Sequence, residues 1–316
     1  MKWVFIALAG ALLIGVAILL WIAIRIFFMA FFRRTPPYNP LYEPLSESIP
    51  KPYYGRFKLA HDWLLSENRH LRVMHIQSHD GLRLMGYLLP GRDQKKFVIL
   101  IHGYHSSSLH DFGCAVKFYH RLGYSVLCTD MRAHGASEGR LICFGLKERY
   151  DAKAWAQELL RAYGDDISIF LHGLSMGATT VMMASALDLP ANVKGIIADC
   201  GFTSPRDIVM YLMQRNYSVH FPPLIWALSL VFRVTSGYWL GSDSTLNAMK
   251  KCPLPMLFVH GGADDFVPTY MSEQNYQTCT AEKQLFIVDG APHAISYLVD
   301  TRGYADRVTP FLQTHA

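Results

Sequence analysis

Residues 172–177 have the sequence His-Gly-Leu-Ser-Met-Gly and lie between two segments of different character. Before them, residues 167–171 form a short apolar run that predicts a buried strand. After them, residues 177–187 are mostly small and apolar, which predicts a tightly packed helix. The glycines beside Ser175 permit a sharp turn that lifts the serine hydroxyl above the end of a sheet. This G-x-S-x-G pattern in strand–turn–helix context predicts a nucleophilic serine at position 175.

Strand-like and helical segments alternate on both sides of this turn, from residue 69 to the end of the chain. Apolar strands that alternate with helices predict a parallel sheet covered by helices on both faces. Residues 201–254 break the rhythm, and their helical segments predict a cap over one end of the sheet. The predicted strands are 72–78, 82–89, 97–102, 124–130, 167–171, 193–199, 255–259 and 284–288.

A serine hydroxyl is a weak nucleophile unless a base accepts its proton. Residues 259–268, which follow a late predicted strand, contain two adjacent aspartates before Val267-Pro268. Residues 289–294 place His293 between the last predicted strand and the final helix. The order nucleophile, acid, histidine resembles the α/β-hydrolase superfamily, in which an Asp, two residues, Val and Pro form the acid loop. That resemblance selects Asp264 over Asp265, which is expected to be a solvated loop residue or a helix cap.

The resemblance extends over residues 70–316 and includes two further motifs. Residues 100–104 are similar to the superfamily's H-G-x turn, which implies an oxyanion hole made by the backbone N–H groups of Tyr104 and Met176. Residues 130–139 are similar to its D-x-R-x-H-G-x-S turn, whose side chains are expected to brace the loop. The resemblance implies an α/β-hydrolase fold with a mostly parallel eight-stranded sheet. It is nearest to bacterial serine hydrolases with an N-terminal anchor and a short helical cap.

The N-terminal segment predicts a membrane anchor. Residues 3–24 carry no charge and are long enough to cross a bilayer core of ~30 Å. The large aromatic and arginine residues that follow do not suit signal-peptide cleavage. We therefore expect a single-pass anchor at 1–34, a proline-rich extended spacer at 35–59 and the hydrolase domain at 60–316. The excess of arginines after the span favours a cytoplasmic domain, and the extracellular side stays open.

Charge and cysteine content exclude several functions. The net charge of +5 belongs to the N-terminus, because residues 1–34 hold four basic residues and no acidic one. The remaining 26 Lys and Arg nearly balance 25 Asp and Glu, so no nucleic-acid partner is expected. The six cysteines have no paired spacing, which favours free thiols. We find no metal-binding motif, and the predicted chemistry needs no cofactor.

These patterns predict a serine hydrolase that cleaves a carboxylic ester. His293 would deprotonate Ser175 and later protonate the leaving group, while Asp264 would orient the imidazole and stabilise its cation. A peptidase, amidase or thioesterase of the same fold is the alternative, and a non-catalytic binding protein is a remote one. The apolar run at residues 221–232 of the predicted cap favours a small acyl substrate with apolar groups.

Overall fold

The computed structural model describes residues 1–33, 35–39 and 51–316. Within them lies one eight-stranded sheet with the spatial order β1-β2-β4-β3-β5-β6-β7-β8. β2 runs antiparallel to both of its neighbours, and every other pair is parallel. The predicted mostly parallel eight-stranded sheet is therefore confirmed. The strands are β1 (Arg72–Gln77), β2 (Arg83–Leu89), β3 (Lys96–Ile101), β4 (Ser125–Thr129), β5 (Ser168–Leu174), β6 (Val193–Asp199), β7 (Met256–Gly261) and β8 (Lys283–Val288).

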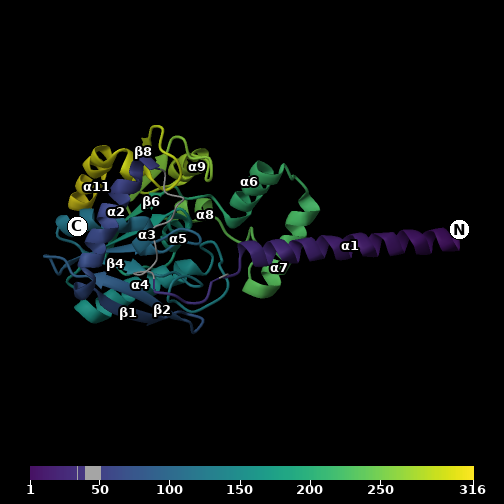
Figure 1. Ribbon diagram of the computed structural model, residues 1–316, viewed down its shortest axis with the longest axis horizontal. Helices are drawn as coiled ribbons and strands as arrows, with labels where there is room; N and C mark the ends of the chain where they lie inside the picture. Colours follow the sequence, from purple (N-terminus) through teal and green to yellow (C-terminus); the bar gives the residue numbers. More distant parts are fainter. Residues whose placement is uncertain (34, 40–50) are drawn as a thin grey trace.

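Helices cover both faces of this sheet, as the alternating sequence pattern predicts (Figure 1). The side chains of β3 show the division, because Ile99 joins one core cluster and Leu100 joins the other. The helices of the described residues are α1 (Lys2–Ala30), α2 (Lys51–Ser66), α3 (Ser108–Arg121), α4 (Glu148–Tyr163), α5 (Met176–Ala184), α6 (Pro205–Tyr217), α7 (Pro222–Ser236), α8 (Thr245–Met249), α9 (Tyr270–Thr278), α10 (Ser296–Val299) and α11 (Thr301–His315). The Ile99 cluster includes residues of α4 and α5, and the Leu100 cluster includes residues of α3 and α11.

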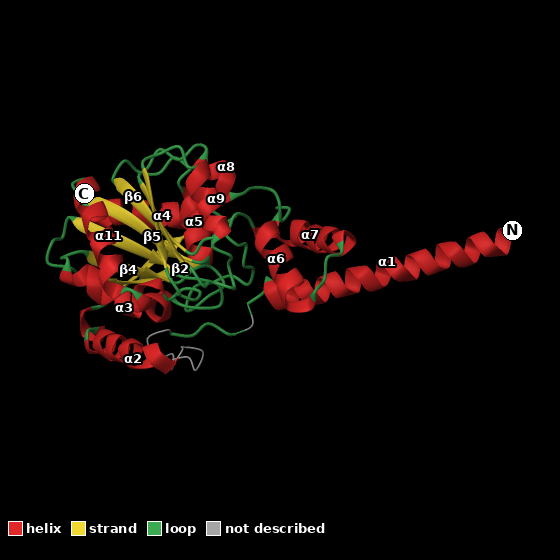
Figure 2. Ribbon diagram, turned by 90° about the horizontal axis from the view of Figure 1, so that it is seen from above, coloured by secondary structure: helices red, strands yellow, loops and turns green. Residues whose placement is uncertain are grey.

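The segment between β6 and β7 holds the helices expected of a cap. Two of them, α6 and α7, stand away from the sheet beside the inner end of α1, and we call them the cap helices (Figure 2). α6 begins where the side chain of Ser204 accepts the backbone N–H of Asp207, with Pro205 in the first turn. α8 differs from the expectation, because it packs on α5 and α9 in the body.

The N-terminal helix α1 has 29 residues and is long and apolar enough to cross a membrane. Most of it projects away from the body (Figure 2). Its last turns do not, because Ala23, Phe27 and Phe31 are at most 1% exposed within the larger core cluster. The chain beyond the helix is also held, since the backbone of Phe31 accepts the N–H of Ile142 at 2.8 Å. The described residues on both sides of the boundary expected at residue 34 therefore contact the body, Arg33 through the carbonyl of Arg140 and Tyr38 through that of Gly135.

The proline-rich segment also differs from the expectation. Residues 40–50 lie outside the described part of the chain, but residues 51–59, predicted as extended, belong to α2. Pro52 sits in the first turn, where a missing backbone N–H costs no helical hydrogen bond. Phe57, Ala60 and Leu64 then follow at helical spacing and are buried, and α2 packs on α3. The apolar spacing outweighs the proline content in this segment.

Replacing Phe31 by alanine is expected to destabilise the protein by about 3–5 kcal/mol, because the side chain is 0% exposed and packs against Phe144 and Phe232. The matched control is Phe28→Ala on the same helix, where the side chain is 51% exposed and the expected loss is much smaller. Chemical denaturation of both variants in detergent measures the difference. Equal stability of the two would contradict the packing of α1 into the body.

Candidate active site

Ser175 occupies a strained turn between β5 and α5. Its φ of 55° lies in the left-handed region, which a residue other than glycine rarely adopts. The two flanking glycines are required by close packing. A Cβ on Gly173 would lie 2.2 Å from the carbonyl oxygen of Gly177, and one on Gly177 would lie 1.8 Å from that of Ile101. The turn therefore lifts Ser175 above the end of the sheet, as the sequence motif predicts.

His293 lies on the loop after β8 and contacts Ser175. Its Nε2 is 3.0 Å from Ser175 Oγ, and its Nδ1 is 2.7 Å from Oδ2 of Asp264. An ionised carboxylate only accepts hydrogen bonds, so Nδ1 carries the proton. In the neutral ring Nε2 is then free of a proton and oriented to accept the one on Ser175. Ser175 and Asp264 lie 118 and 29 positions before His293 in the sequence, yet the three residues form one hydrogen-bonded chain.

Asp264 is held by donors on both of its oxygens. Oδ1 accepts the backbone N–H groups of Phe266 and Val267, each at 2.9 Å. Oδ2 faces both His293 and His260, whose Nε2 is 3.1 Å away. Burial alone would raise the pKa of Asp264, but the hydrogen bonds from the two histidines outweigh it and hold the pKa below its usual range. The carboxylate is therefore ionised at neutral pH.

The neighbouring Asp265 points elsewhere. Its Oδ2 lies 2.6 Å from Nη2 of Arg215 in α6, and its side chain is 77% exposed. The two aspartates therefore differ in position. The carboxylate of Asp264 faces His293, whereas that of Asp265 joins the cap helix α6 to the loop after β7.

The two residues expected to form an oxyanion hole flank Ser175. Met176 starts α5, so its N–H belongs to the first turn, which has no intrahelical acceptor. Tyr104 follows Gly103, where an added Cβ would lie 3.3 Å from the Cβ of Ser175. The carboxylate of Asp111 accepts the N–H of Gly103 at 2.7 Å and holds this turn against the serine. A carbonyl oxygen of a substrate bound at Ser175 would thus meet the Tyr104–Met176 side of the site.

The loop that follows β4 supports the same turn through polar contacts. Nε2 of His102 accepts the N–H of Met131, and Nε2 of His134 accepts the N–H of His105, both at 3.0 Å. Asp130 accepts the N–H of Ala136 within its own loop at 2.8 Å. These side chains brace the loops, as expected from the motif at residues 130–139.

A cavity of about 180 Å³ borders Ser175, and its lining is almost entirely apolar. Three parts of the chain form its walls: the body, the cap helix α6 and the end of α1. The Tyr104 phenol donates a hydrogen bond to the carbonyl oxygen of Ala30 at 2.8 Å and joins the body to α1. A larger hollow of about 780 Å³ lies over β1 and α4, away from these groups. The residues that line the Ser175 cavity are Ile26, Met29, Ala30, Phe31, Tyr104, Phe144, Ser175, Phe202, Ile208, Val209, Leu212, Met213, Asn216, Tyr217, Phe266 and Val267.

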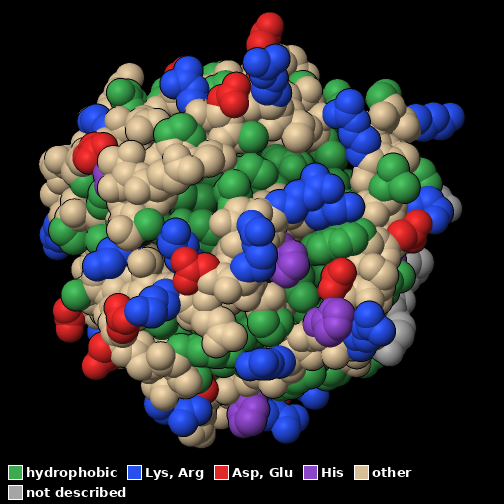
Figure 3. All heavy atoms as spheres, turned by 90° about the vertical axis from the view of Figure 1, so that its left-hand side faces the viewer, with side chains coloured by type: hydrophobic (Ala, Val, Ile, Leu, Met, Phe, Trp, Pro, Cys, Tyr) green, Lys and Arg blue, Asp and Glu red, His purple; other side chains and the backbone are tan. Residues whose placement is uncertain are grey.

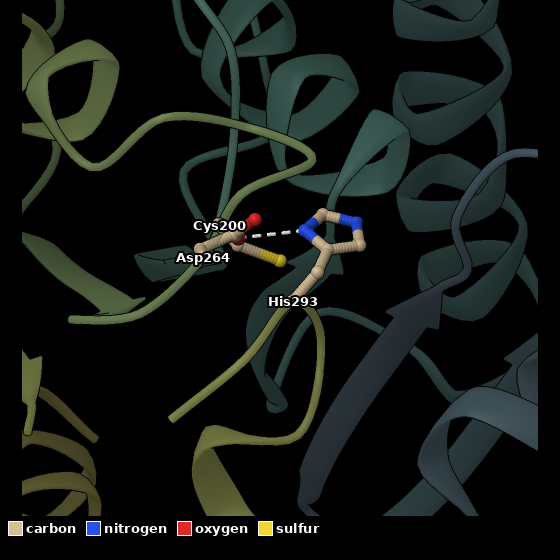
Figure 4. Close-up of side chains that lie close together, drawn as sticks. All are labelled: Cys200, Asp264 and His293. Atoms are coloured by element: carbon tan, nitrogen blue, oxygen red, sulfur yellow. Dashed lines mark hydrogen bonds and ion pairs between the residues drawn. The ribbon is translucent and has the colours of Figure 1, made fainter. Parts of the chain in front are cut away.

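One group of potential metal ligands lies in the site, formed by Cys200, Asp264 and His293 (Figure 4). Its donor atoms fall within 4.8 Å of one another. Two features oppose a metal here. The proton on Nδ1 of His293 already bridges to Asp264, and burial raises the pKa of Cys200, so its thiol keeps its proton. The group is better suited to orienting His293 than to binding a cation.

Comparison with known proteins supports the fold. The sequence model of a family described as the alpha/beta hydrolase fold matches residues 96–219. The Pyrococcus furiosus esterase PF2001 superimposes with a TM-score of 0.63 at 22% identity, over 89% of this chain and 99% of that one. The chain has the α/β-hydrolase fold. All six of its cysteines are free thiols, as their spacing predicts.

Two relatives at the sequence level are named as uncharacterized proteins. The uncharacterized protein YqkD of Bacillus subtilis is 28% identical over 240 residues, which covers 75% of this chain and 77% of that protein. The uncharacterized membrane protein YNL320W of Saccharomyces cerevisiae is 26% identical over 201 residues, or 62% of this chain and 63% of that one. Reaction class and substrate must therefore be inferred from this chain's own site.

Two features of this α/β-hydrolase site are not evident from the motifs. His260 is the second-last residue of β7, donates from Nε2 to the carbonyl of Val267 and also faces Asp264. Its position four residues before Asp264 was the available signal. The contribution of α1 to the cavity is the second feature, and the apolar residues after Arg25, in excess of the span, were its signal.

Proposed function

We propose that the protein is a serine hydrolase that cleaves a carboxylic ester, with Ser175, His293 and Asp264 as its catalytic residues. The observation that carries the proposal is the continuous hydrogen-bonded chain from Ser175 through His293 to Asp264, at 3.0 and 2.7 Å. The esterases among the structural neighbours support the same reaction class.

In the acylation step, Ser175 Oγ attacks the ester carbonyl carbon as its proton passes to Nε2 of His293. The negative charge that develops on the carbonyl oxygen is stabilised by the backbone N–H groups of Tyr104 and Met176. Asp264 stabilises the imidazolium that forms, because its low pKa keeps it ionised beside Nδ1. His293 then gives the proton to the departing alcohol, and the acyl group stays on Ser175.

In the deacylation step, a water molecule takes the place of the alcohol. His293 removes a proton from the water as its oxygen attacks the acyl carbon, and the proton then returns to Ser175. The carboxylic acid leaves, and the starting state is restored. An ester, a thioester and an amide differ in this scheme only in the leaving group.

We also propose that α1 anchors the protein in a membrane. Its length and apolar composition support this, and so does the relative in yeast that is named a membrane protein. The face of the molecule opposite α1 carries Lys, Arg, Asp and Glu side chains spread over it, as suits a surface in water (Figure 3).

The proposal is tested with the full chain purified in detergent. A fluorophosphonate probe is expected to label it, and 4-nitrophenyl butyrate is expected to be cleaved with a higher kcat/KM than a butyryl thioester or anilide. A thioester preferred by tenfold or more would favour the thioesterase alternative. If the chain is not labelled by the probe and does not hydrolyse the esters, the hydrolase proposal is refuted in favour of a binding protein.

Lengthening the acyl group is expected to raise kcat/KM, because the cavity beside Ser175 is apolar. Each methylene buried contributes up to ~0.8 kcal/mol, so butyryl should exceed acetyl by about tenfold. 4-Nitrophenyl acetate, butyrate and octanoate are compared on the wild type and on Leu212→Trp, which narrows the cavity. Leu59→Trp, on a side chain 71% exposed, is the control. A flat profile in the wild type would contradict an acyl-binding cavity.

A further inference from the structure

The end of the membrane helix is part of the catalytic cavity. Ile26, Met29, Ala30 and Phe31 line the cavity that borders Ser175. The uncharged stretch of α1 ends at residue 24, and an α-helix rises ~1.5 Å per residue. The cavity therefore begins within ~10 Å of the end of the apolar span. Ester groups of membrane lipids lie at this depth, between the headgroups and the hydrocarbon.

The exposed residues of the cavity lining lie on α1 and α6 and mark its opening. They are Met29 on α1 at 46%, Tyr217 at the end of α6 at 66%, and the neighbouring Asn216. A molecule that enters between them passes directly along the foot of the membrane helix. An engineered cavity of about 150 Å³ holds benzene, so 180 Å³ accommodates only a segment of similar carbon number. The remainder of a long acyl chain would have to extend through this opening.

The outer face of α7 is apolar and exposed. Trp226, Leu230 and Val234 follow one another at a spacing of four residues, with exposed fractions of 69%, 44% and 78%. The opposite face of the same helix holds the buried residues Leu228 and Phe232. A surface helix in water ordinarily presents polar side chains on its outer face. α7 instead has the composition of a helix that lies in a membrane interface, where tryptophan is enriched.

α7 lies at the same level as part of α1 along the axis of the membrane helix. They lie side by side (Figures 1 and 2), and α7 is the element that α1 contacts most. Leu19 and Leu20 of α1 are half-buried and pack on the core cluster that includes Leu228. Both leucines belong to the uncharged stretch that would cross the bilayer. A membrane spanned by α1 therefore reaches the level of α7 and would cover its apolar outer face.

We propose that the substrate is the long-chain acyl ester of a membrane lipid, which enters the cavity directly from the bilayer between α1 and α6 while α7 lies in the membrane interface. This rests on the hydrolase activity proposed above. The lipid need not leave the bilayer as a whole, because only its ester group and the first carbons of its acyl chain move to Ser175 in the cavity. The reaction forms a fatty acyl group on Ser175 and releases the lipid alcohol, and water then releases the fatty acid.

The test compares a lipid ester with a water-soluble ester on the full chain reconstituted in phosphatidylcholine vesicles. 1-Oleoylglycerol in the vesicles is the lipid probe, and 4-nitrophenyl butyrate is the soluble one. In Trp226→Glu/Leu230→Glu, two charges on the outer face of α7 are expected to lower oleate release at least tenfold. Hydrolysis of the soluble ester should change less than twofold, since neither residue lines the Ser175 cavity. That unchanged rate also shows that the variant is folded.

The matched control is Leu59→Glu/Val73→Glu, which places two charges on apolar side chains that are 71% and 63% exposed on α2 and β1. It should leave both rates unchanged. The single variant Val234→Glu repeats the test at a 78% exposed position and should lower oleate release at least threefold. Oleate release that is unaffected by the α7 charges, or absent while the soluble ester is cleaved, would overturn the bilayer route alone. Absence of both activities in the wild type would instead refute the hydrolase proposal.

Discussion

Ser175→Ala is expected to lower kcat for ester hydrolysis by a factor of ~10⁴–10⁶ and to abolish labelling by a fluorophosphonate. The hydroxyl is the only group of this residue that can form the acyl-enzyme, and its Oγ lies 3.0 Å from Nε2 of His293. The left-handed φ of 55° is no harder for alanine than for serine, so the turn should persist. Labelling and burst kinetics on the purified chain measure the effect.

The control for that substitution is Ser185→Ala, just beyond the end of the same helix. Ser185 is 1% exposed, comparable to 5% for Ser175, and its hydroxyl donates to the carbonyl of Met182, away from His293. Both variants should have similar melting temperatures, whereas only Ser175→Ala should lose labelling. If Ser175→Ala were still labelled, the nucleophile would be a different residue.

Asp264→Asn is expected to lower kcat by a factor of about 10⁴. The amide NH₂ group that replaces Oδ2 can donate to Nδ1 of His293, which favours the tautomer with the proton on Nε2 and leaves no base for Ser175. Asp265→Asn carries the same chemical change one residue away and should alter kcat by less than threefold. Its carboxylate contacts Arg215 in α6 and is 77% exposed, so little electrostatic energy is lost. Steady-state kinetics with a soluble ester on the two variants compare these expectations.

Fluorophosphonate labelling separates the role of Asp264, which orients His293, from that of Ser175, which reacts with the probe. Asp264→Asn should keep fluorophosphonate labelling at a reduced rate, since Ser175 remains present. Equal losses of kcat in the two asparagine variants, or a larger loss in Asp265→Asn, would show that the acid residue is assigned incorrectly.

The sheet and the serine turn are predictable from the sequence because their signals are local. The glycines around Ser175 have no room for a side chain, so the turn itself demands them. The parallel strands from β3 to β7 are almost wholly buried on both faces and therefore appear as continuous apolar runs. The position of His293 is similarly local, since it follows the last strand directly. These features depend on neighbours in the sequence rather than on distant contacts.

The walls of the cavity could not be predicted in this way. Apolar residues of α1 look alike whether they face lipid or protein, and only tertiary packing distinguishes the buried Phe31 from the exposed Phe28. The helix over residues 51–66 was missed for a related reason. Pro50 and Pro52 at its start favour an extended chain locally, and the packing of Phe57 and Leu64 reverses that preference. His260 was missed because its one signal, its position four residues before Asp264, does not by itself indicate a contact between the two side chains.

The burial of Phe27 and Phe31 makes α1 specific to the domain on which it packs. A foreign transmembrane helix of equal hydropathy would retain the protein at the same bilayer, yet it would leave the core and the acyl cavity with one wall missing. We expect natural variation to follow the same division. The N-terminal turns of α1 can exchange one apolar residue for another, whereas the residues of its last two turns should vary only together with the domain residues that they contact. In a chimaera, the segment that has to be transferred together with the domain therefore begins within the last two turns of α1.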